Sequence, residues 1–418
     1  MNKKKILLVY YGVLFVLLLT TWARQDFISM PIRVGYLALV FLPAVNRVSL
    51  FFPCLVLFLT TSLLSFAGYT FMPTETTVYL LMAGVFAFIA FRERRDYKYP
   101  YVLFLVIFFI SIVVNLVTSG KIETISYSFL LLLLLPITIN EKEKEFVADI
   151  VPKLFILSTT ACACLTLLNQ ELLIRESYNH ERLISGSLNY TCCTLGIGFV
   201  LSLRELIKTS TKKYWRLFYV FCMMVLLITV IMEASRGAML AIVVSSVLIV
   251  FNKTSKLRTK IITVVLASIF IAVLYNNQVL DLLIYRIQSD TGTGTGRTEI
   301  WGHKLTQHFN SFSFLSFVFG RGYDNTWNLG GFGHDLIGCH NDFVAFLIEY
   351  GIIGIILFLT IIFYPLHVAK SRSIRSDILP LVVYLLMTCM TLEPFSMGYL
   401  PFCFFLFFIY LRSCSKTV

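Results

Sequence analysis

Residues 217–251 read LFYVFCMMVLLITVIMEASRGAMLAIVVSSVLIVF, which is two apolar runs, 217–234 and 237–251, that meet at Ser235-Arg236-Gly237. A helix that spans a membrane needs about 20 mainly apolar residues. In lipid the backbone must satisfy its own hydrogen bonds, and a helix does so within a single segment. The stretch therefore predicts two membrane-spanning helices with almost no loop between them.

The composition of the whole chain extends this interpretation. Of the 418 residues, 58% are hydrophobic and 14% are charged, whereas soluble domains are about 45–50% apolar and about 25% charged. This excludes an ordinary water-soluble enzyme, and we expect an all-α polytopic integral membrane protein. The net charge of +12 indicates membrane orientation and no nucleic-acid partner, because Lys and Arg concentrate in the cytoplasmic loops of membrane proteins.

Hydropathy divides the chain into three predicted regions. Residues 1–276 are expected to form transmembrane helices and to include the turn at 235–237, residues 277–340 an extracytoplasmic loop, and residues 341–418 the C-terminal transmembrane helices. Some segments are short for a span, so the expected number of helices is about 12–14. The apolar segments lie near residues 6–21, 33–45, 48–68, 77–91, 101–118, 126–139, 147–168, 190–203, 217–234, 237–251, 261–276, 341–364, 378–392 and 399–411.

The distribution of cations predicts the orientation of these helices. With a cytoplasmic N-terminus, 24 of the 35 Lys and Arg residues fall in segments on the cytoplasmic side and ten fall outside. By the positive-inside rule, we expect both termini in the cytoplasm and the long loop on the outer side of the membrane.

Cysteine usage gives no sign of a disulfide framework or a zinc site. Most of the ten cysteines lie in apolar runs, where Cys behaves as a small hydrophobic residue. Metal binding is an alternative only for the crowded group His334, Asp335, Cys339, His340 and Asp342. Adjacent residues rarely point at one ion, and the chain has no Asp-x-Asp pair, so we expect no metal ion.

The predicted outer loop, residues 277–340, holds most of the distinctive polar sequence. Residues 297–309 place Ile300, Trp301, Leu305 and Phe309 at helical spacing, which predicts a short helix on the membrane surface. The preceding Gly-Thr repeat is typical of a flexible approach and lacks the Lys-Ser/Thr end of a nucleotide-binding loop. The polar stretches are Thr291-Gly-Thr-Gly-Thr-Gly296, Arg297-Thr-Glu-Ile-Trp301, Phe319-Gly-Arg-Gly-Tyr-Asp324 and Cys339-His-Asn-Asp342.

Arg236 is the most informative single residue of the sequence. It lies between two apolar runs at the predicted outer mouth, and a charge near membrane depth costs about 2.5–3.5 kcal/mol on insertion scales unless it has a partner. One interpretation is a structural pair with Glu233. The other is an anion site that faces the outer leaflet.

The topology brings three such groups to the outer side. Arg236 and Arg297 come from separate segments and could clamp a pyrophosphate, because the guanidinium fork matches phosphate oxygens. His340 opens a span on the same side, and its neutral imidazole could accept a proton from a hydroxyl. Taken alone, His340 is more often a capping or hydrogen-bonding group, but beside two arginines a base is the stronger hypothesis.

The order of these motifs resembles the O-antigen ligase/polymerase superfamily. The resemblance covers about residues 190–365, and residues 1–190 match only as a set of spans. It is carried by Ser235-Arg236-Gly237, Gly296-Arg297 with Trp301, Phe319-Gly-Arg-Gly-Tyr323 and His340-Asn-Asp-Phe-Val-Ala-Phe-Leu-Ile-Glu-Tyr-Gly-Ile-Ile-Gly354. The outer loop is compact for a ligase, which is a departure from the family pattern.

The resemblance implies a metal-independent, GT-C-like membrane glycosyltransferase with no cofactor. Its donor would be an undecaprenyl-pyrophosphate-linked glycan at the outer, periplasmic face of the bacterial inner membrane, and a chain-length regulator is a possible partner. In this family Arg236 and Arg297 would bind and neutralise the pyrophosphate, and His340 would activate the acceptor hydroxyl. The remaining residues implied to bind pyrophosphate or glycan, or to orient His340, are Trp301, Arg321, Tyr323, Asn341, Asp342 and Glu349, with helix capping as the alternative for Asp342.

Three functions remain open at this point. A polymerase joins the growing chain to another lipid-linked repeat unit, and a ligase transfers it to the lipopolysaccharide core. We favour the polymerase because the short outer loops offer little surface for core binding. A transporter or flippase of lipid-linked glycans is the alternative of another class, but the chain shows no convincing internal repeat and its polar groups cluster on one side.

Overall fold

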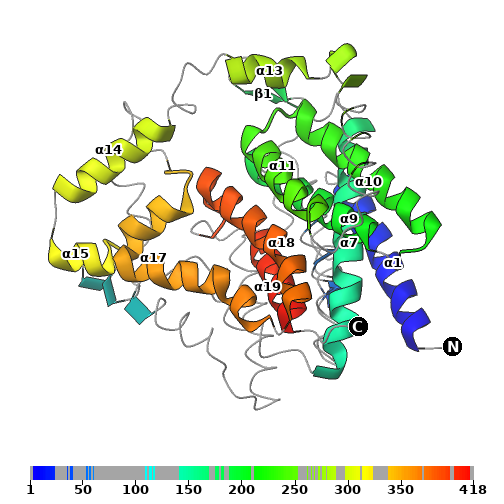
Figure 1. Ribbon diagram of the computed structural model, residues 1–418, viewed down its shortest axis with the longest axis horizontal. Coiled ribbons are helices and arrows are strands. Elements are labelled where there is room, and N and C mark those ends of the chain that lie inside the picture. Colours follow the sequence, from blue (N-terminus) through cyan, green and yellow to red (C-terminus); the bar gives the residue numbers. More distant parts are fainter. Residues whose placement is uncertain are drawn as a thin grey trace.

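A computed structural model describes the chain over residues 3–23, 141–168, 175–177, 180–182, 188–208, 211–252, 281–288, 297–310, 313–322, 338–369, 371–395 and 400–414, and at single positions between 35 and 117 and between 261 and 280. Within these residues the protein is helical except for one antiparallel hairpin, formed by β1 (Arg175–Ser177) and β2 (His180–Arg182). Figure 1 shows the helices as a bundle with an arm formed by α14, α15 and part of α17.

Most of the described helices lie in predicted apolar segments, whereas α13, α14 and α15 lie in the predicted loop 277–340. Their bounds are α1 (Lys3–Ala23), α7 (Glu141–Leu168), α9 (Leu188–Ile207), α10 (Lys213–Met232), α11 (Arg236–Val250), α13 (Asp281–Gln288), α14 (Arg297–Asn310), α15 (Phe314–Phe319), α17 (Asp342–Val368), α18 (Arg372–Thr391) and α19 (Leu400–Cys414).

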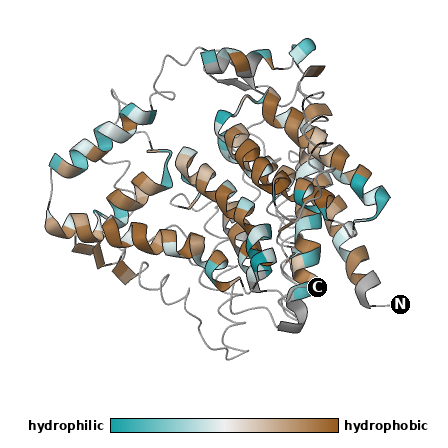
Figure 2. Ribbon diagram, viewed as in Figure 1, coloured by the Kyte–Doolittle hydropathy of each residue, from teal (hydrophilic) through white to brown (hydrophobic). Residues whose placement is uncertain are grey.

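Five of the described helices are long and apolar enough to cross a membrane. They lie over Glu145–Leu168, Asn189–Ile207, Lys213–Met232, Asp342–Val368 and Arg372–Thr391. Figure 2 shows apolar residues along the bundle helices and hydrophilic residues mainly on α14 and at helix ends. The prediction of an all-α polytopic membrane protein is confirmed. The total of 12–14 spans concerns in part residues outside the described ones, such as 61–108.

The bundle is organised around α9. This helix packs against α7, α10 and α11, while α18 packs against α11, α17 and α19. Tyr384 of α18 donates its hydroxyl to the carbonyl of Cys193 in α9 at 2.6 Å, and both residues are buried. The packed helices bury apolar side chains on their facing sides, while apolar residues such as Leu217 of α10 face outward, as expected of a surface that meets lipid.

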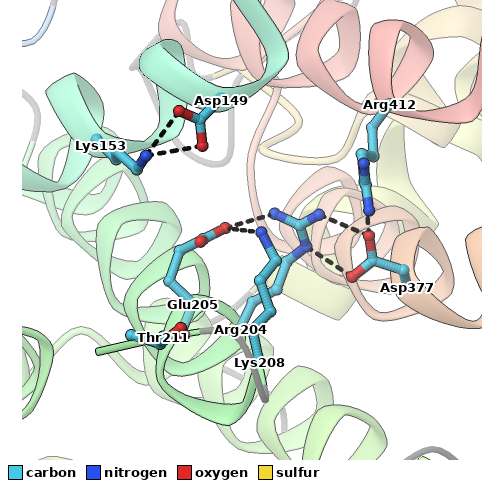
Figure 3. A network of polar contacts seen from close by, with 8 residues as sticks. All are labelled: Asp149, Lys153, Arg204, Glu205, Lys208, Thr211, Asp377 and Arg412. Carbon is cyan, nitrogen blue, oxygen red and sulfur yellow. Dashed lines mark hydrogen bonds and ion pairs between the residues drawn. The ribbon is translucent and has the colours of Figure 1, made fainter. Parts of the chain in front are cut away.

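A charged network joins three of these helices at one end (Figure 3). Arg204 of α9, whose side chain is 4% exposed, donates Nε to Asp377 Oδ1 of α18 at 2.8 Å and Nη1 to Glu205 at 2.9 Å. Arg412 of α19 donates Nε to Asp377 Oδ2 at 2.9 Å. Asp377 thus binds two guanidinium groups and ties α9, α18 and α19 together.

The charged network distinguishes the two ends of α18. The helix rises 1.5 Å per residue, so Asp377 lies about 21 Å from Thr391, the last residue of α18. The segment between them is mainly apolar. Arg204 and Arg412 belong to the cations that the sequence predicts on the cytoplasmic side. The bundle therefore has a cation-rich end at Asp377 and an opposite end at Thr391.

Helix α17 differs from the single continuous span predicted for residues 341–364. It contains a break at Gly351, where φ is 66° and ψ is −164°. Phe346 before the break and Phe358 after it stack with their ring centroids 4.3 Å apart. In Figure 1 the two parts of α17 run in different directions, and α15 lies beside the bend.

The backbone after α15 fills this break. Arg321 N donates to the Ile348 carbonyl at 2.8 Å and Gly322 N donates to the Glu349 carbonyl at 3.0 Å. A Cβ atom on Gly320 would lie 2.2 Å from Glu349 O, and one on Gly351 would lie 2.4 Å from Val318 O. The two glycine motifs of the sequence are therefore contact partners, because only glycine permits this close approach of two backbones.

We expect Gly351→Ala to lower the thermal stability of the protein in detergent. A residue with a side chain at positive φ costs on the order of 1–3 kcal/mol, and the added Cβ would also collide with Val318 O. Gly302→Ala in α14 is the matched control, because nothing lies within 4 Å of its Cβ position. This control should be neutral or stabilise by about 1 kcal/mol. Equal melting temperatures for the two variants would contradict the proposed packing.

We also expect Asp377→Asn to destabilise the bundle by about 3–5 kcal/mol, because it leaves the buried Arg204 without its main counter-charge. The control is Lys153→Gln, which breaks an ion pair with Asp149 whose two side chains are 36% and 67% exposed. Such an exposed pair contributes about 0–1 kcal/mol. Unfolding followed by denaturant titration in detergent would compare the two variants, and a loss for Asp377→Asn no larger than the control would argue against the network.

Candidate functional site

Arg236 is the first residue of α11, at the turn between α10 and α11. Ala234 in this turn has a positive φ of 50°, and Glu233 and Ser235 are buried. Ser235 is the residue before the helix, and its hydroxyl donates to Asn189 Oδ1 at 3.2 Å. Arg236 is therefore at the positive end of the α11 dipole, a position that favours a negatively charged ligand.

The first turn of α11 contacts the end of α18. A Cβ atom on Gly237 would lie 2.8 Å from Thr391 Oγ1 and 3.0 Å from its Cβ. Glycine is thus required here for close approach of the two helices. The Ser-Arg-Gly motif places Arg236 beside the last residue of α18.

Arg297 also contacts Thr391, from helix α14. It is the first residue of α14, and its Nη1 donates to the Thr391 carbonyl at 2.8 Å. The last carbonyl groups of a helix have no partner within the helix, so the guanidinium satisfies one of them. One turn later, Trp301 donates Nε1 to the Cys339 carbonyl at 2.6 Å, which ties α14 to the residues just before His340.

His340 precedes α17 and has an unusual backbone conformation. Its φ is 49°, and its side chain is half-buried with Nδ1 enclosed and without a hydrogen-bond partner among the described residues. The next residue, Asn341, caps α17 by accepting from Phe343 N at 2.9 Å and Val344 N at 3.2 Å. The capping group is therefore Asn341 and not Asp342, the residue for which the sequence suggested this role.

Asp342 instead holds the segment that follows α18. Its N–H donates to the Leu392 carbonyl at 3.1 Å, and its Oδ2 accepts from Phe395 N at 3.1 Å. Asn341 Nδ2 adds a longer contact to the Met390 carbonyl at 3.4 Å. Residues 390–395 and the start of α17 thus form one hydrogen-bonded unit.

The structure therefore brings together the elements that carry Arg236, Arg297 and His340. The starts of α11, α14 and α17 all contact α18 between Met390 and Leu392. Arg297 is also close enough to His340 for its charge to lower the histidine pKa. These groups lie at the end of the bundle opposite Asp377.

Arg321 lies apart from Arg297, at the other end of α14. Its Nε donates to His308 Nδ1 at 3.1 Å and its Nη2 donates to the His308 carbonyl at 2.9 Å. His308 is eleven residues after Arg297 in α14, which separates them by about 16 Å along the helix. Arg321 therefore joins the far end of α14 to the break in α17. Glu349 is buried in α17 at that break, and Tyr323 lies outside the described residues.

Helix α14 turns its polar side inward. Lys304 is 1% exposed and His308 is fully buried, whereas Phe309 of the predicted apolar face is 44% exposed. Ile300, Trp301 and Leu305 are half-buried. The predicted apolar face is thus partly covered by the protein, and the inward face carries Lys304 and His308.

Two charged residues next to His340 were not found from the sequence. Glu393, 2% exposed, lies close to the backbone of His340 and Asn341 and to the Cys339 thiol, and these groups favour the charged form of its carboxyl. Lys304 faces Cys339, Glu393 and Glu349. The sequence did point to Glu393, because it is the only charged residue between residues 378 and 411. Like Arg236, it is a charge within apolar sequence and is costly without a partner. No feature of the sequence pointed to Lys304, since a lysine in an amphipathic helix usually faces solvent.

The electrostatics of this cluster favour a neutral imidazole. Burial lowers the pKa of His340, and the charges of Arg297 and Lys304 lower it further. Burial also lowers the pKa of Lys304, although Cys339, Glu393 and Glu349 counteract this. Burial raises the pKa of Glu393, against the stabilising contacts of its carboxylate. His340 is consequently available as a proton acceptor at neutral pH.

The part of the chain that the structure describes has no group of three or more His, Cys, Asp and Glu residues that could hold a metal ion. Two members of the crowded group in the sequence, His334 and Asp335, lie outside the described residues.

Comparison with known families bears on the same region. Residues 221–359 match the Wzy_C family model, which is described as O-antigen ligase. The chain carries a domain of the O-antigen ligase/polymerase superfamily. The matched range contains Arg236, Arg297 and His340, runs from α10 into the second part of α17, and supports a function of the O-antigen ligase/polymerase type. A search of the curated proteins found no match.

We expect Lys304→Met to raise the pKa of His340, because it removes a positive charge that disfavours the imidazolium. Diethyl pyrocarbonate reacts with neutral imidazole and not with imidazolium, and peptide mapping resolves each histidine, so the pH dependence of His340 modification reports this pKa. The modification curve of His340 should move to higher pH in the variant. A His340 curve that does not move, or moves to lower pH, would contradict the assigned electrostatics.

Proposed function

We propose that the protein is a membrane glycosyltransferase that polymerises undecaprenyl-pyrophosphate-linked repeat units into O-antigen or a related surface polysaccharide. The proposal places the reaction at the periplasmic face of the bacterial inner membrane, with both termini in the cytoplasm. The observation that carries it is the convergence of Arg236, Arg297 and His340 at one end of α18, within the region that matches the O-antigen ligase family.

In the proposed reaction an acceptor hydroxyl attacks the anomeric carbon of the lipid-linked sugar. The new C–O bond forms as the bond between the anomeric carbon and the phosphate oxygen breaks, and the electron pair leaves with undecaprenyl pyrophosphate. His340 accepts the hydroxyl proton, which its lowered pKa permits near neutral pH. Because pyrophosphate is already a competent leaving group, the protein mainly neutralises charge and aligns the two substrates.

Arg236 and Arg297 supply the positive charge in this scheme. Arg236 lies at the N-terminus of α11, where backbone N–H groups also point outward from the helix. Arg297 uses Nη1 to bind the Thr391 carbonyl, which fixes the direction of its guanidinium. Two arginines can take the place of a metal ion in stabilising a diphosphate leaving group, so the proposed enzyme needs neither a metal nor another cofactor.

The residues around His340 are assigned supporting roles. Asn341 and Asp342 hold the start of α17 against residues 390–395, and Glu393 lies close to the backbone of the turn. Trp301 holds the Cys339 carbonyl. We assign Tyr323, in the same motif as Arg321, to the glycan path. Membrane lipid surrounds the bundle, and residues 1–190 are the candidate contact for a chain-length regulator.

The ligase is the second candidate, because the matching family model is described as O-antigen ligase and the two reactions differ only in the acceptor. The third candidate, a flippase, places its polar groups near the bilayer midplane. Here the three groups lie at the end of α18 instead, and the midsection of α18 between Asp377 and Thr391 is mainly apolar, so the polymerase and ligase are favoured over transport.

We expect His340→Ala to lower the rate of glycan transfer by about 10²–10⁴-fold, the usual contribution of a general base. The assay uses purified protein, a lipid-linked repeat unit and gel analysis of the chain length. His303→Ala is the matched control, since His303 is exposed and lies in the neighbouring helix α14. A normal rate for His340→Ala in correctly inserted protein would remove the catalytic assignment.

Deletion of the gene distinguishes the three candidates. Loss of a polymerase should leave single repeat units on the lipopolysaccharide core. Loss of a ligase should leave a bare core while lipid-linked chains accumulate, and loss of a flippase should leave repeat units on the cytoplasmic leaflet. We expect the first pattern, restored by the unmodified gene and by His303→Ala but not by His340→Ala.

A further inference from the structure

One stripe of α14 carries polar residues that face the protein. In order, the stripe is Arg297, Trp301, Lys304 and His308. Their intervals of four, three and four positions place them on one face of the helix. The first two bind the carbonyls of Thr391 and Cys339, and the last accepts a hydrogen bond from Arg321. The remaining member, Lys304, is therefore directed at the protein between Cys339 and Arg321, and it is 1% exposed.

Two buried carboxyl groups lie near the ammonium group of Lys304. The ionisable groups that face it are Cys339 before α17, Glu349 in α17 and Glu393 after α18. Glu349 and Glu393 are each 2% exposed. A buried cation with acidic partners is held by those partners, and its burial keeps it from direct contact with a substrate. Any effect of Lys304 on the reaction must therefore pass through its neighbours.

Glu393 is the neighbour that links Lys304 to His340. It lies close to the backbone of His340 and Asn341, and its Oε1 is enclosed with no hydrogen-bond partner among the described residues. An enclosed carboxylate stays charged only if a nearby cation offsets the cost of its burial. Lys304 is a cation that does so.

The turn beside Glu393 needs such support. His340 has a φ of 49°, and a residue with a side chain keeps this conformation only where its surroundings hold it. The same turn sets the direction of the imidazole and the place of Asn341, which caps α17. A loss of charge at Glu393 would therefore be felt first at His340.

We propose that Lys304 is a positioning residue of the transferase, which through Glu393 holds the turn at His340 and so directs the imidazole toward the acceptor hydroxyl. The inference rests on the proposed function. Lys304 touches neither substrate in this assignment, and Arg236 and Arg297 remain to bind the donor. Its loss should therefore lower kcat and leave KM for the donor nearly unchanged.

The test measures kcat and KM for glycan transfer in three variants. We expect Lys304→Met to lower kcat by at least about tenfold at neutral pH and to change KM for the lipid-linked donor by less than about threefold. Lys304→Arg keeps the charge, so its kcat should stay within about threefold of the unmodified value. Thr306→Met is the matched control on the exposed side of α14, and its kcat should stay within about twofold.

The pH dependence distinguishes a charge effect from a packing effect. Lys304 lowers the pKa of Glu393 and of His340, so both groups hold their protons to higher pH when it is removed. The proposed working state has a charged Glu393 and a neutral His340. A rise from about pH 7 to about pH 9 should therefore restore kcat of Lys304→Met by at least about threefold relative to the unmodified protein.

Three results would overturn the proposal. The first is a normal kcat for Lys304→Met. The second is an equal loss for Lys304→Met and Lys304→Arg at every pH, which would indicate that Lys304 only fills space. The third is a rise in donor KM with kcat unchanged, which would indicate that Lys304 binds the diphosphate itself. If Lys304→Met does not insert into the membrane, Lys304→Gln, which lacks the charge but keeps a hydrogen-bond donor, replaces it in the same assay.

Hydrogen exchange tests the support of the turn without the reaction. If the unmodified protein transfers no glycan, the proposed function fails, and this measurement then decides the role of Lys304 independently. The backbone N–H groups of His340 and Asn341 should exchange at least about tenfold faster in Lys304→Met than in the unmodified protein, and within about twofold of it in Lys304→Arg and Thr306→Met. Unchanged exchange in Lys304→Met would show that the turn does not depend on this lysine and would overturn the proposal.

Discussion

The carbonyl end of α18 is the point on which the candidate site depends. Helices end with carbonyl groups that lack partners within the helix, and here they are satisfied by groups from distant parts of the chain. Arg297 binds the Thr391 carbonyl and Asp342 N–H binds the Leu392 carbonyl, while Gly237 lets α11 approach Thr391 closely. Because these contacts fix the starts of α11, α14 and α17, they also fix the residues beside each start.

Helix α18 separates the ion pairs around Asp377 from the cations of the candidate site. At one end Asp377 binds Arg204 and Arg412, and these ion pairs hold the helices together. At the other end the cations lie beside a histidine with a lowered pKa. About 21 Å of mainly apolar helix lies between the two ends. This separation lets one end stabilise the bundle, and the proposed anionic ligand is assigned to the other.

Much of the architecture was predictable because helices in lipid must be continuous apolar segments. The sequence predicted the membrane bundle and the helix that starts at Arg297, and it singled out Arg236 and His340 as candidates for the site. It did not predict the break in α17, because a glycine in an apolar run does not by itself indicate that a helix breaks there. The break follows from the contact of this segment with Gly320 and its neighbours. It also missed Glu393 and Lys304, whose burial depends on residues from three separate segments.

The sequence by itself determined that the chain is a membrane protein and that Arg236 lies between two apolar runs. These properties depend on local composition and on the cost of burying charge in lipid. Only the tertiary structure decided that Arg297 meets the end of α18, that Asn341 is the cap of α17, and that Arg321 binds His308 at the far end of α14. The reason is that each of these contacts joins segments distant in the chain, and their partners follow from how helices pack, which local sequence does not encode.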